Sequence, residues 1–408
     1  DNVAGSLSFS VITTNGSGTF SNWVIGARVD VPAISVGQII WSQDVGTPAF
    51  SGRFLRLDAS KVNKTDWPDL TNFSEKNGVY LVNGGQNWAE SSESGIISTS
   101  YLSSVGSDGS NIVIAGGTQL LYSTDGGQTY TESVDSNSIS TNNFLGAGSD
   151  GTNIVVVGYS GTILYSTDGG QTYTESVDSR SITTKTLYDV ASDGVNIAVC
   201  ARDGFIFYST DGGQTYTESA SSGVVADTYL FGIASDGENI AAVGWSGQLI
   251  FSEDGGQTYS KSANNAEFGT NNDFYAATSD GSNIIATGEG GLLVYSTDGG
   301  RNYTESSSSR LVTTQDLNGV TSNGSVVVAV GTAGTILISN DSGVTYTESS
   351  YSGVLTTEEL LDVGTDGSNI VASGTNGTLI FSLTDETILT LSPELRDGIY
   401  SGYVRATT

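Results

Sequence analysis

Short apolar runs separated by turn-forming residues occupy most of this chain. One stretch carries four of them, rich in Val, Ile, Tyr or Thr and bounded by Asp-Gly or Gly-Gly pairs, at 144–147, 154–157, 162–165 and 172–175. Runs of this length and composition between such turns are typical of β-strands joined by hairpins. The pattern therefore predicts four antiparallel strands within this stretch.

The same unit recurs seven times, with a spacing of 42 to 44 residues. Its first turn carries an acid or amide at Asp108, Asp150, Asp193, Asp236, Asp280, Asn323 and Asp366. Four strands per unit at this period are typical of a β-propeller blade. We therefore predict an all-β fold, a seven-bladed β-propeller of four-stranded antiparallel blades, preceded by a small N-terminal β-region. A solenoid is the structural alternative, but neither end shows the polar capping unit that a solenoid needs.

Each unit also carries a second repeated signature. It occurs eight times if the degenerate copies that begin at Leu81 and Ser382 are counted, which is one more than the seven copies of the first-turn signature. This surplus predicts that residues 87–91 form the outermost strand of the last blade, so that strands from both ends close a propeller spanning residues 78–388. Closing a chain of this length costs about 5 kcal/mol in loop entropy, which strand pairing can offset. An eighth, divergent blade from residues 54–92 is the alternative.

Acidic residues outnumber basic ones by 44 to 14 in the 408 residues, for a formal net charge of -30. Such a surface repels nucleic acid and anionic membranes, so neither is an expected partner. It suits an extracellular or salty setting, where salt screens the self-repulsion. No apolar run approaches the ~20 residues needed to span a bilayer, which argues against membrane insertion.

The chain has no histidine, one cysteine and no methionine. Without histidine there is no histidine metal site, no Ser-His-Asp triad and no histidine base. Cys200 lies in an apolar run, so we expect it to be buried and without an intramolecular disulfide. Because Asp1 is not a methionine, we expect it not to be the translation start and any signal peptide to precede it.

The second repeated signature of the unit reads STDGGQTY from Ser123, Ser166 and Ser209, with variants from Ser252, Ser296 and Ser339. These segments resemble the Asp-box, or BNR repeat, of propellers that include sialidases, other glycosidases, sorting receptors and photosystem assembly factors. The resemblance implies that the box links the third and fourth strands as a folding element away from any active site. Its carboxylates, expected to be structural caps, are Asp125, Asp168, Asp211, Asp254, Asp298 and Asp341. We predict no cofactor or metal; calcium is the alternative, although single Asp-Gly turns lack the spaced oxygen ligands of a calcium loop.

The loops that vary between units are expected to gather on one face. In an up-and-down blade the first and third turns share a face, and the second turn and the link to the next blade share the other. Tyr159 and Trp245 occupy equivalent second turns, Arg202 lies in the same turn of the blade between them, and Arg180 and Arg310 are equivalent in their links. Aromatic rings beside Ser-, Thr- and Asn-rich links suit uncharged glycans, so these five are the candidate binding residues. The alternative is solvated loops and rim packing.

Catalysis is not expected. Asp-box sialidases use an arginine triad and a Tyr nucleophile with a Glu partner, whereas this chain has nine arginines and lacks the Arg-Ile-Pro signature of that family. A pair of carboxylates remains the enzymatic option, with Asp203, Glu289 and Glu359 as candidates. Their other interpretation is as surface acids.

Residues 54–70, FLRLDASKVNKTDWPDL, resemble the short tail-collar motif of phage tail fibres. Leu57, Asp58, Ser60, Val62, Pro68 and Leu70 match in order, with Ala59 in place of Gly and Trp67 in place of Tyr. We therefore predict a β attachment region at 1–53, a tail-collar-like microdomain at 54–77 and a C-terminal strand extension at 389–408. An ordinary linker is the alternative for 54–77.

The leading hypothesis is a non-catalytic virion-surface protein, a phage tail-fibre or adhesion component. Its N-terminal region would contact other virion proteins, and its propeller would bind a host-surface glycan or receptor, on the virion surface or outside the cell. A homo-oligomer is compatible with this hypothesis. One alternative is a secreted or cell-surface microbial glycosidase or lectin. Another is a propeller assembly factor that binds a protein partner.

Overall fold

The computed structural model describes residues 88–98, 100–265, 267–268 and 272–382. All of them belong to one unit that covers Asn83–Thr384. The regions predicted at 1–53, 54–77 and 389–408 lie outside the described residues and stay predictions. Among the described residues, no helix has the length and apolarity needed to cross a membrane.

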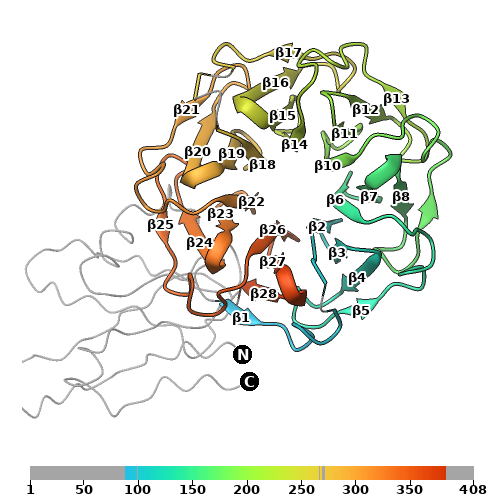
Figure 1. Ribbon diagram of the computed structural model, residues 1–408, viewed down its shortest axis with the longest axis horizontal. Helices are drawn as coiled ribbons and strands as arrows, with labels where there is room; N and C mark the ends of the chain where they lie inside the picture. Colours follow the sequence, from blue (N-terminus) through green and yellow to red (C-terminus); the bar gives the residue numbers. More distant parts are fainter. Residues whose placement is uncertain (1–87, 99, 266, 269–271, 383–408) are drawn as a thin grey trace, which may run out of the picture. The chain divides into compact units, whose positions relative to one another are not determined.

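Seven four-stranded antiparallel sheets form a ring, which confirms the predicted propeller (Figure 1). Blade 1 contains β2 (Ser104–Ser107), β3 (Ile112–Gly116), β4 (Gln119–Ser123) and β5 (Thr131–Glu132). Blade 2 contains β6 (Phe144–Ser149), β7 (Ile154–Gly158), β8 (Ile163–Ser166) and β9 (Thr174–Glu175). Blade 3 contains β10 (Leu187–Ser192), β11 (Ile197–Ala201), β12 (Ile206–Ser209) and β13 (Thr217–Glu218). Blade 4 contains β14 (Leu230–Ser235), β15 (Ile240–Gly244), β16 (Gln248–Ser252) and β17 (Ser260–Lys261).

The remaining blades repeat this plan around the ring. Blade 5 contains β18 (Phe274–Ser279), β19 (Ile284–Gly288), β20 (Leu292–Ser296) and β21 (Thr304–Glu305). Blade 6 contains β22 (Leu317–Ser322), β23 (Val327–Gly331), β24 (Thr335–Ser339) and β25 (Thr347–Glu348). Blade 7 contains β26 (Leu360–Thr365), β27 (Ile370–Gly374), β28 (Leu379–Ser382) and β1 (Trp88–Glu90).

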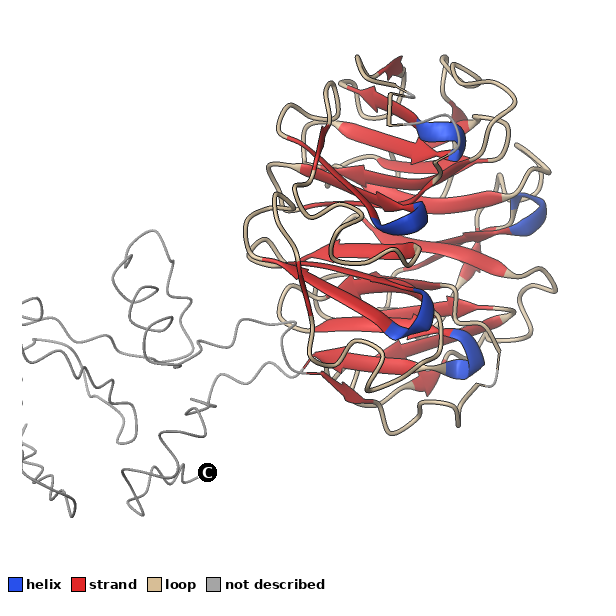
Figure 2. Ribbon diagram, turned by 60° about the vertical axis from the view of Figure 1, so that its left-hand side comes forward, coloured by secondary structure: helices blue, strands red, loops and turns tan. Residues whose placement is uncertain are grey.

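Single 3-10 turns join the second and third strands of five blades: η2 (Tyr159–Gly161), η3 (Trp245–Gly247), η4 (Glu289–Gly291), η5 (Thr332–Gly334) and η6 (Thr375–Gly377). Figure 2 shows them as short helical turns at the ends of the strands. The first strand of each blade lies nearest the centre of the ring, as Figure 1 shows.

The hydrophobic core lies between blades. The second strand of every blade is buried along its whole length. One cluster joins Val155 and Val157 of blade 2 to Leu187 and Val199 of blade 3, and similar clusters follow around the ring. Cys200 is buried there, as predicted, and its thiol donates to the carbonyl of Leu230 in blade 4. Because each sheet buries its faces against its neighbours, the ring gains most of its apolar burial only when the blades stack.

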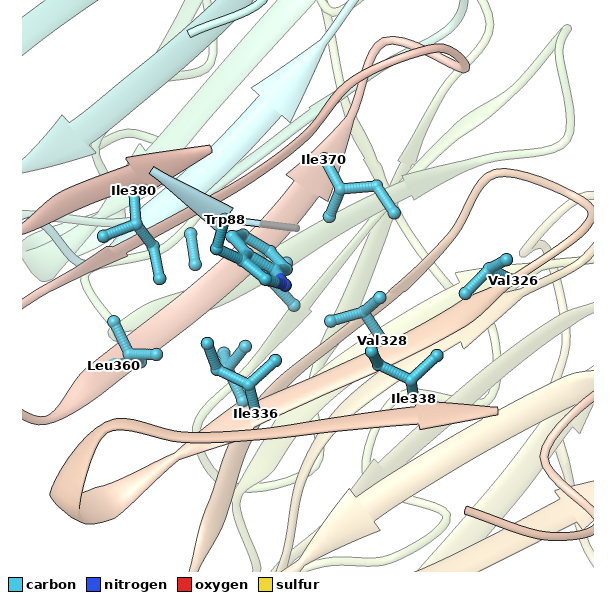
Figure 3. Packing of buried hydrophobic residues seen from close by; sticks show 11 residues of the cluster. Trp88, Val326, Val328, Ile336, Ile338, Leu360, Ile370 and Ile380 are labelled. Atoms are coloured by element: carbon cyan, nitrogen blue, oxygen red, sulfur yellow. The ribbon is translucent and has the colours of Figure 1, made fainter. Parts of the chain in front are cut away.

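The ring closes through blade 7, where β1 pairs with β28. Trp88 lies opposite Ser382, and its ring is buried among residues of blades 6 and 7, including Val328 and Ile370 (Figure 3). The prediction that residues 87–91 complete the last blade is therefore confirmed for 88–90. The eight-bladed alternative is wrong, because residues 88–90 already belong to the seventh sheet.

Candidate binding site on the variable face

A carboxylate within each box turn accepts hydrogen bonds from that turn. We call box turns the six segments between third and fourth strands that begin at Ser123, Ser166, Ser209, Ser252, Ser296 and Ser339. Asp168 accepts hydrogen bonds from Thr172 N at 2.9 Å, Thr172 Oγ1 at 2.6 Å and Ser166 Oγ at 2.8 Å. Asp125, Asp211, Asp254, Asp298 and Asp341 accept the same set, with Asn302 replacing the threonine at Asp298. Burial acts to raise the pKa of each carboxyl, but these bonds hold the pKa below its usual value. Their oxygens are thus committed to the turn.

Within the part of the chain that the structure describes, no group of three or more Cys, Asp or Glu side chains could hold a metal ion. The calcium alternative stays an untested prediction.

The links between blades are partly structural as well. In blade 2 the link begins at Ser176, whose Oγ donates to the carbonyl of Gln214 in the next box turn at 2.8 Å. Two residues on, Asp178 accepts from Tyr216 N at 2.8 Å. The serine bond recurs from Ser91, Ser133, Ser219, Ser262 and Ser306. Part of the polar composition of the links therefore holds neighbouring blades together.

The links also lie against the second turns, which confirms the predicted division of faces. Arg180 N donates to Gly161 O at 2.8 Å, and the link residues Asn137, Gly223, Arg310, Gly353 and Gly95 bond in the same way to their own second turns. On the other face, Asn153 of a first turn lies against Gly212 of the next box turn. We call the face that carries second turns and links the variable face.

The five predicted binding residues separate into two groups. Tyr159 and Trp245 open η2 and η3 and are 44% and 43% exposed, and Arg202 occupies the equivalent turn of blade 3. Arg180 and Arg310 instead pair with Glu175 and Glu305 of their own outer strands, with N–O distances of 3.3 and 3.7 Å.

Aromatic side chains from blades 3, 4 and 5 meet around Arg202 and Trp245, and Tyr159 of blade 2 lines the same cavity as three of them. Trp245 stacks on Tyr229, with ring centroids 5.2 Å apart and planes 15° apart. The Arg202 guanidinium lies 5.2 Å from the Tyr229 ring centroid. Tyr229 neighbours Phe231 at 5.9 Å, and Phe231 neighbours Tyr188 at 5.1 Å and Tyr275 at 6.3 Å. We call this set the aromatic patch: Tyr159, Tyr188, Tyr229, Phe231, Trp245 and Tyr275.

The aromatic patch borders the central cavity of the ring, a space of about 990 Å³ lined by the inner strands. Tyr159, Tyr188, Phe231 and Tyr275 belong to its lining. Sequence reasoning missed all of the patch except Tyr159 and Trp245. The signal was present, because the residue after the buried first residue of each inner strand reads Leu145, Tyr188, Phe231, Tyr275, Asn318 and Leu361 along blades 2 to 7.

The carboxylates of Asp189 and Asp362 also line this cavity, and sequence reasoning did not single them out. Asp189 Oδ2 accepts from Ile233 N of blade 4 at 3.0 Å, and Asp362 Oδ2 accepts from Val105 N of blade 1 at 2.8 Å. Burial raises the pKa of Asp362 to about 6, and burial together with the Asp362 charge raises that of Asp189 to about 8. Both lie where a register shift interrupts the inner strand, and each joins its blade to the next.

The three acids considered for glycoside hydrolysis belong to blades 3, 5 and 7. Asp203 bonds to Lys185 at 2.7 Å, which lowers the pKa of that carboxyl. A general acid needs a raised pKa instead. Glu289 opens η4, and Glu359 accepts from Asn318 Nδ2 at 3.1 Å.

No protein-family model matches the chain, and no curated protein matches it. Solved structures do resemble it. YCF48 bound to D1 peptide is 17% identical with a TM-score of 0.58, over 75% of this chain and 97% of that one. YCF48 from Cyanidioschyzon merolae is 16% identical with a TM-score of 0.56, over 72% of this chain and 98% of that one. At these identities the likeness shows the propeller fold alone.

Proposed function

We propose that this protein is a non-catalytic binding propeller that holds a segment of a protein partner on its aromatic patch. The observation that carries the proposal is the aromatic patch itself: five rings from blades 3 to 5 contact one another, and four of the six patch residues, including Tyr159 of blade 2, line the central cavity. Tyr and Trp are enriched in protein interfaces, where they supply large contact areas with few rotatable bonds.

The fold itself does not require these aromatic residues. Thr332 and Thr375 open η5 and η6 at the position that Trp245 takes in η3, and the three turns have the same backbone shape. Asn318 and Leu361 likewise replace the aromatic side chains of the inner strands. Since blades 6 and 7 form without them, the aromatic patch is explained better by binding than by folding.

The acids considered for glycoside hydrolysis support a non-catalytic role. They belong to three different blades, and the carboxylate of Asp203 is paired with Lys185. A propeller of similar fold is known bound to a peptide, YCF48 with D1 peptide, which supports a polypeptide as the ligand class. This favours the protein-partner alternative over the phage tail-fibre hypothesis.

A host-surface glycan is the second candidate ligand. Exposed Tyr159 and Trp245 offer ring faces on which sugars stack, beside links rich in Ser and Thr. The phage hypothesis rests on residues 54–70, outside the described residues. It stays a prediction, together with virion partners and an extracellular location.

Selection from a random peptide library and a glycan array, both against the full chain, tests the proposal. We expect peptides with micromolar or better affinity, weakened at least about tenfold by Trp245→Thr and by Tyr229→Thr. Val134→Ala is the matched control: Val134 is 79% exposed, and Ala220 and Ala263 hold the equivalent link position. Peptide binding that both patch variants leave unchanged would contradict the proposal. Glycan binding that is lost in Trp245→Thr, without any selected peptide, would establish the second candidate instead.

A further inference from the structure

We propose that the aromatic patch is electrically polarised, and that it selects a segment with an acidic residue at its blade 3 end and a basic residue at its blade 5 end. This rests on the proposed function, because it specifies the ligand of the same site. It commits the site to one occupant, an extended polypeptide with opposite charges about five residues apart.

The blade 3 end is cationic. Arg202 lies over Tyr229, and Lys185 lies 4.5 Å from the Phe205 ring centroid. Both cations share one carboxylate, since Asp203 lies 2.7 Å from Lys185 Nζ and 3.6 Å from Arg202 Nε. Two positive charges against one negative charge leave this end net positive, although the chain as a whole carries -30.

The blade 5 end is anionic. Asp273 accepts from Ser246 N at 2.9 Å, beside Trp245, and Asp316 accepts from Gly290 N at 2.8 Å, beside Glu289. These three carboxylates act on the Tyr275 hydroxyl: its pKa is raised to about 12 by burial and then by Asp316, Glu289 and Asp273. Among the described residues no Lys or Arg forms an ion pair with any of the three.

The aromatic row between these ends sets the length of the ligand. It steps 5.2 Å from Arg202 to Tyr229, 5.9 Å to Phe231 and 6.3 Å to Tyr275. The sum of these steps is the longest path along the row, and an extended chain advances about 3.3 Å per residue, so a segment of up to about five residues covers it. An acidic side chain at one end of such a segment can reach Arg202 while a basic one at the other end reaches the carboxylates around Tyr275.

Four peptide-display libraries, selected against the full chain at physiological salt, test the polarity. Each has four random residues between fixed ends: Glu and Lys, Glu and Glu, Lys and Lys, or Gln and Gln. Exposed ion pairs contribute up to about fivefold each, so we expect the Glu and Lys library to be enriched over the Gln and Gln library by about twofold to 25-fold. Attraction to bulk negative charge alone would enrich the Lys and Lys library most, which would overturn the inference.

Two charge variants complete the test, and both use side chains that other blades carry at the same turn position. Arg202→Glu makes both ends anionic, so the Lys and Lys library should become the most enriched. Glu289→Thr should reduce the advantage of the Glu and Lys library by about two- to fivefold. An unchanged order of the libraries in Arg202→Glu would overturn the polarity.

The Trp245→Thr variant separates a failure of the polarity from a failure of the proposed function. If the native protein shows no charge preference and the variant abolishes enrichment in all four libraries, the proposed function is retained and the polarity is rejected. Enrichment that the variant does not change in any library rejects both.

Discussion

At the residue scale, the aromatic ring of each box turn serves the fold through its volume. Tyr130, Tyr173, Tyr216, Tyr259, Tyr303 and Tyr346 are buried, and none of their hydroxyls has a hydrogen-bond partner among the described residues. Burial raises the pKa of the Tyr173 hydroxyl, as do the charges of Asp168 and Asp108, so it stays protonated at neutral pH. The hydroxyl therefore contributes no hydrogen bond to the propeller fold among the described residues.

Replacing Tyr173 by Phe should therefore not weaken the protein. No hydrogen bond to another described residue is lost, and the desolvation cost of the hydroxyl is removed, so we expect the free energy of unfolding to change by less than about 0.5 kcal/mol or to rise. Urea denaturation measures it. Tyr173→Ala is the control and should lose about 3 kcal/mol or more through the cavity it leaves. A loss above about 1.5 kcal/mol in Tyr173→Phe would show that the hydroxyl has a stabilising partner.

At the element scale, the second turn is shaped by the link that lies on it. Gly161, with φ of 71°, ends η2 directly beneath the link from blade 2. A Cβ at this position would lie 1.9 Å from the carbonyl oxygen of Thr183. Gly151, in the first turn of the same blade, has φ of 88° and open space where its Cβ would be.

These two glycines form a matched pair for substitution by alanine. Gly151→Ala meets only the left-handed backbone cost, about 1 kcal/mol. Gly161→Ala adds a clash with backbone that cannot be relieved by a rotamer change, so we expect a loss of about 3 kcal/mol or more. Thermal and urea unfolding of both variants would measure the difference. Equal losses would mean that the link does not press on the second turn.

At the element scale, the sequence predicts the blades but not every contact between them. The 43-residue period and its surplus half-unit were sufficient for the seven blades and for the strand that completes blade 7. The register shifts of the inner strands were not predictable, because no turn residue marks them. Contacts such as Trp245 on Tyr229 and Asp189 on Ile233 depend on how twisted strands and neighbouring blades approach each other, which a linear pattern does not specify. The patch residues could have been found only by aligning the repeats and asking which position fails to repeat.

At the scale of the whole molecule, two acids of the central cavity and the hydrogen-bonded carboxylates of the box turns predict an acid-shifted stability optimum. An unfolded Asp titrates near 3.9, whereas Asp362 and Asp189 are raised to about 6 and about 8. The folded state therefore holds more protons than the unfolded state between about pH 4 and 8, and stability falls as pH rises through that window. The box carboxylates have lowered pKa values, so their contribution is lost as pH falls below about 4.

We expect maximum stability near pH 4 to 5, measured as the free energy of unfolding from pH 3 to 9. The double variant Asp189→Asn with Asp362→Asn should flatten the decline above pH 5. Between pH 5 and pH 9 we expect it to lose roughly 5 kcal/mol less stability than the native protein loses. Glu238→Gln, at an exposed acid of a first turn, is the control for net charge. A double variant with the native pH slope would contradict this assignment.

In our proposal the repeated box turns build the ring, while the non-repeating aromatic patch binds the ligand. The most direct test of this proposal is the dissociation constant of one selected peptide, measured by calorimetry together with the melting temperature, for two variants of blade 4. Trp245→Thr should weaken binding at least about tenfold with an unchanged melting temperature, whereas Asp254→Ala, which removes the hydrogen bonds of its box turn, should lower the melting temperature with unchanged affinity. Loss of affinity in Asp254→Ala at a temperature where it is fully folded, with native affinity in Trp245→Thr, would contradict the account.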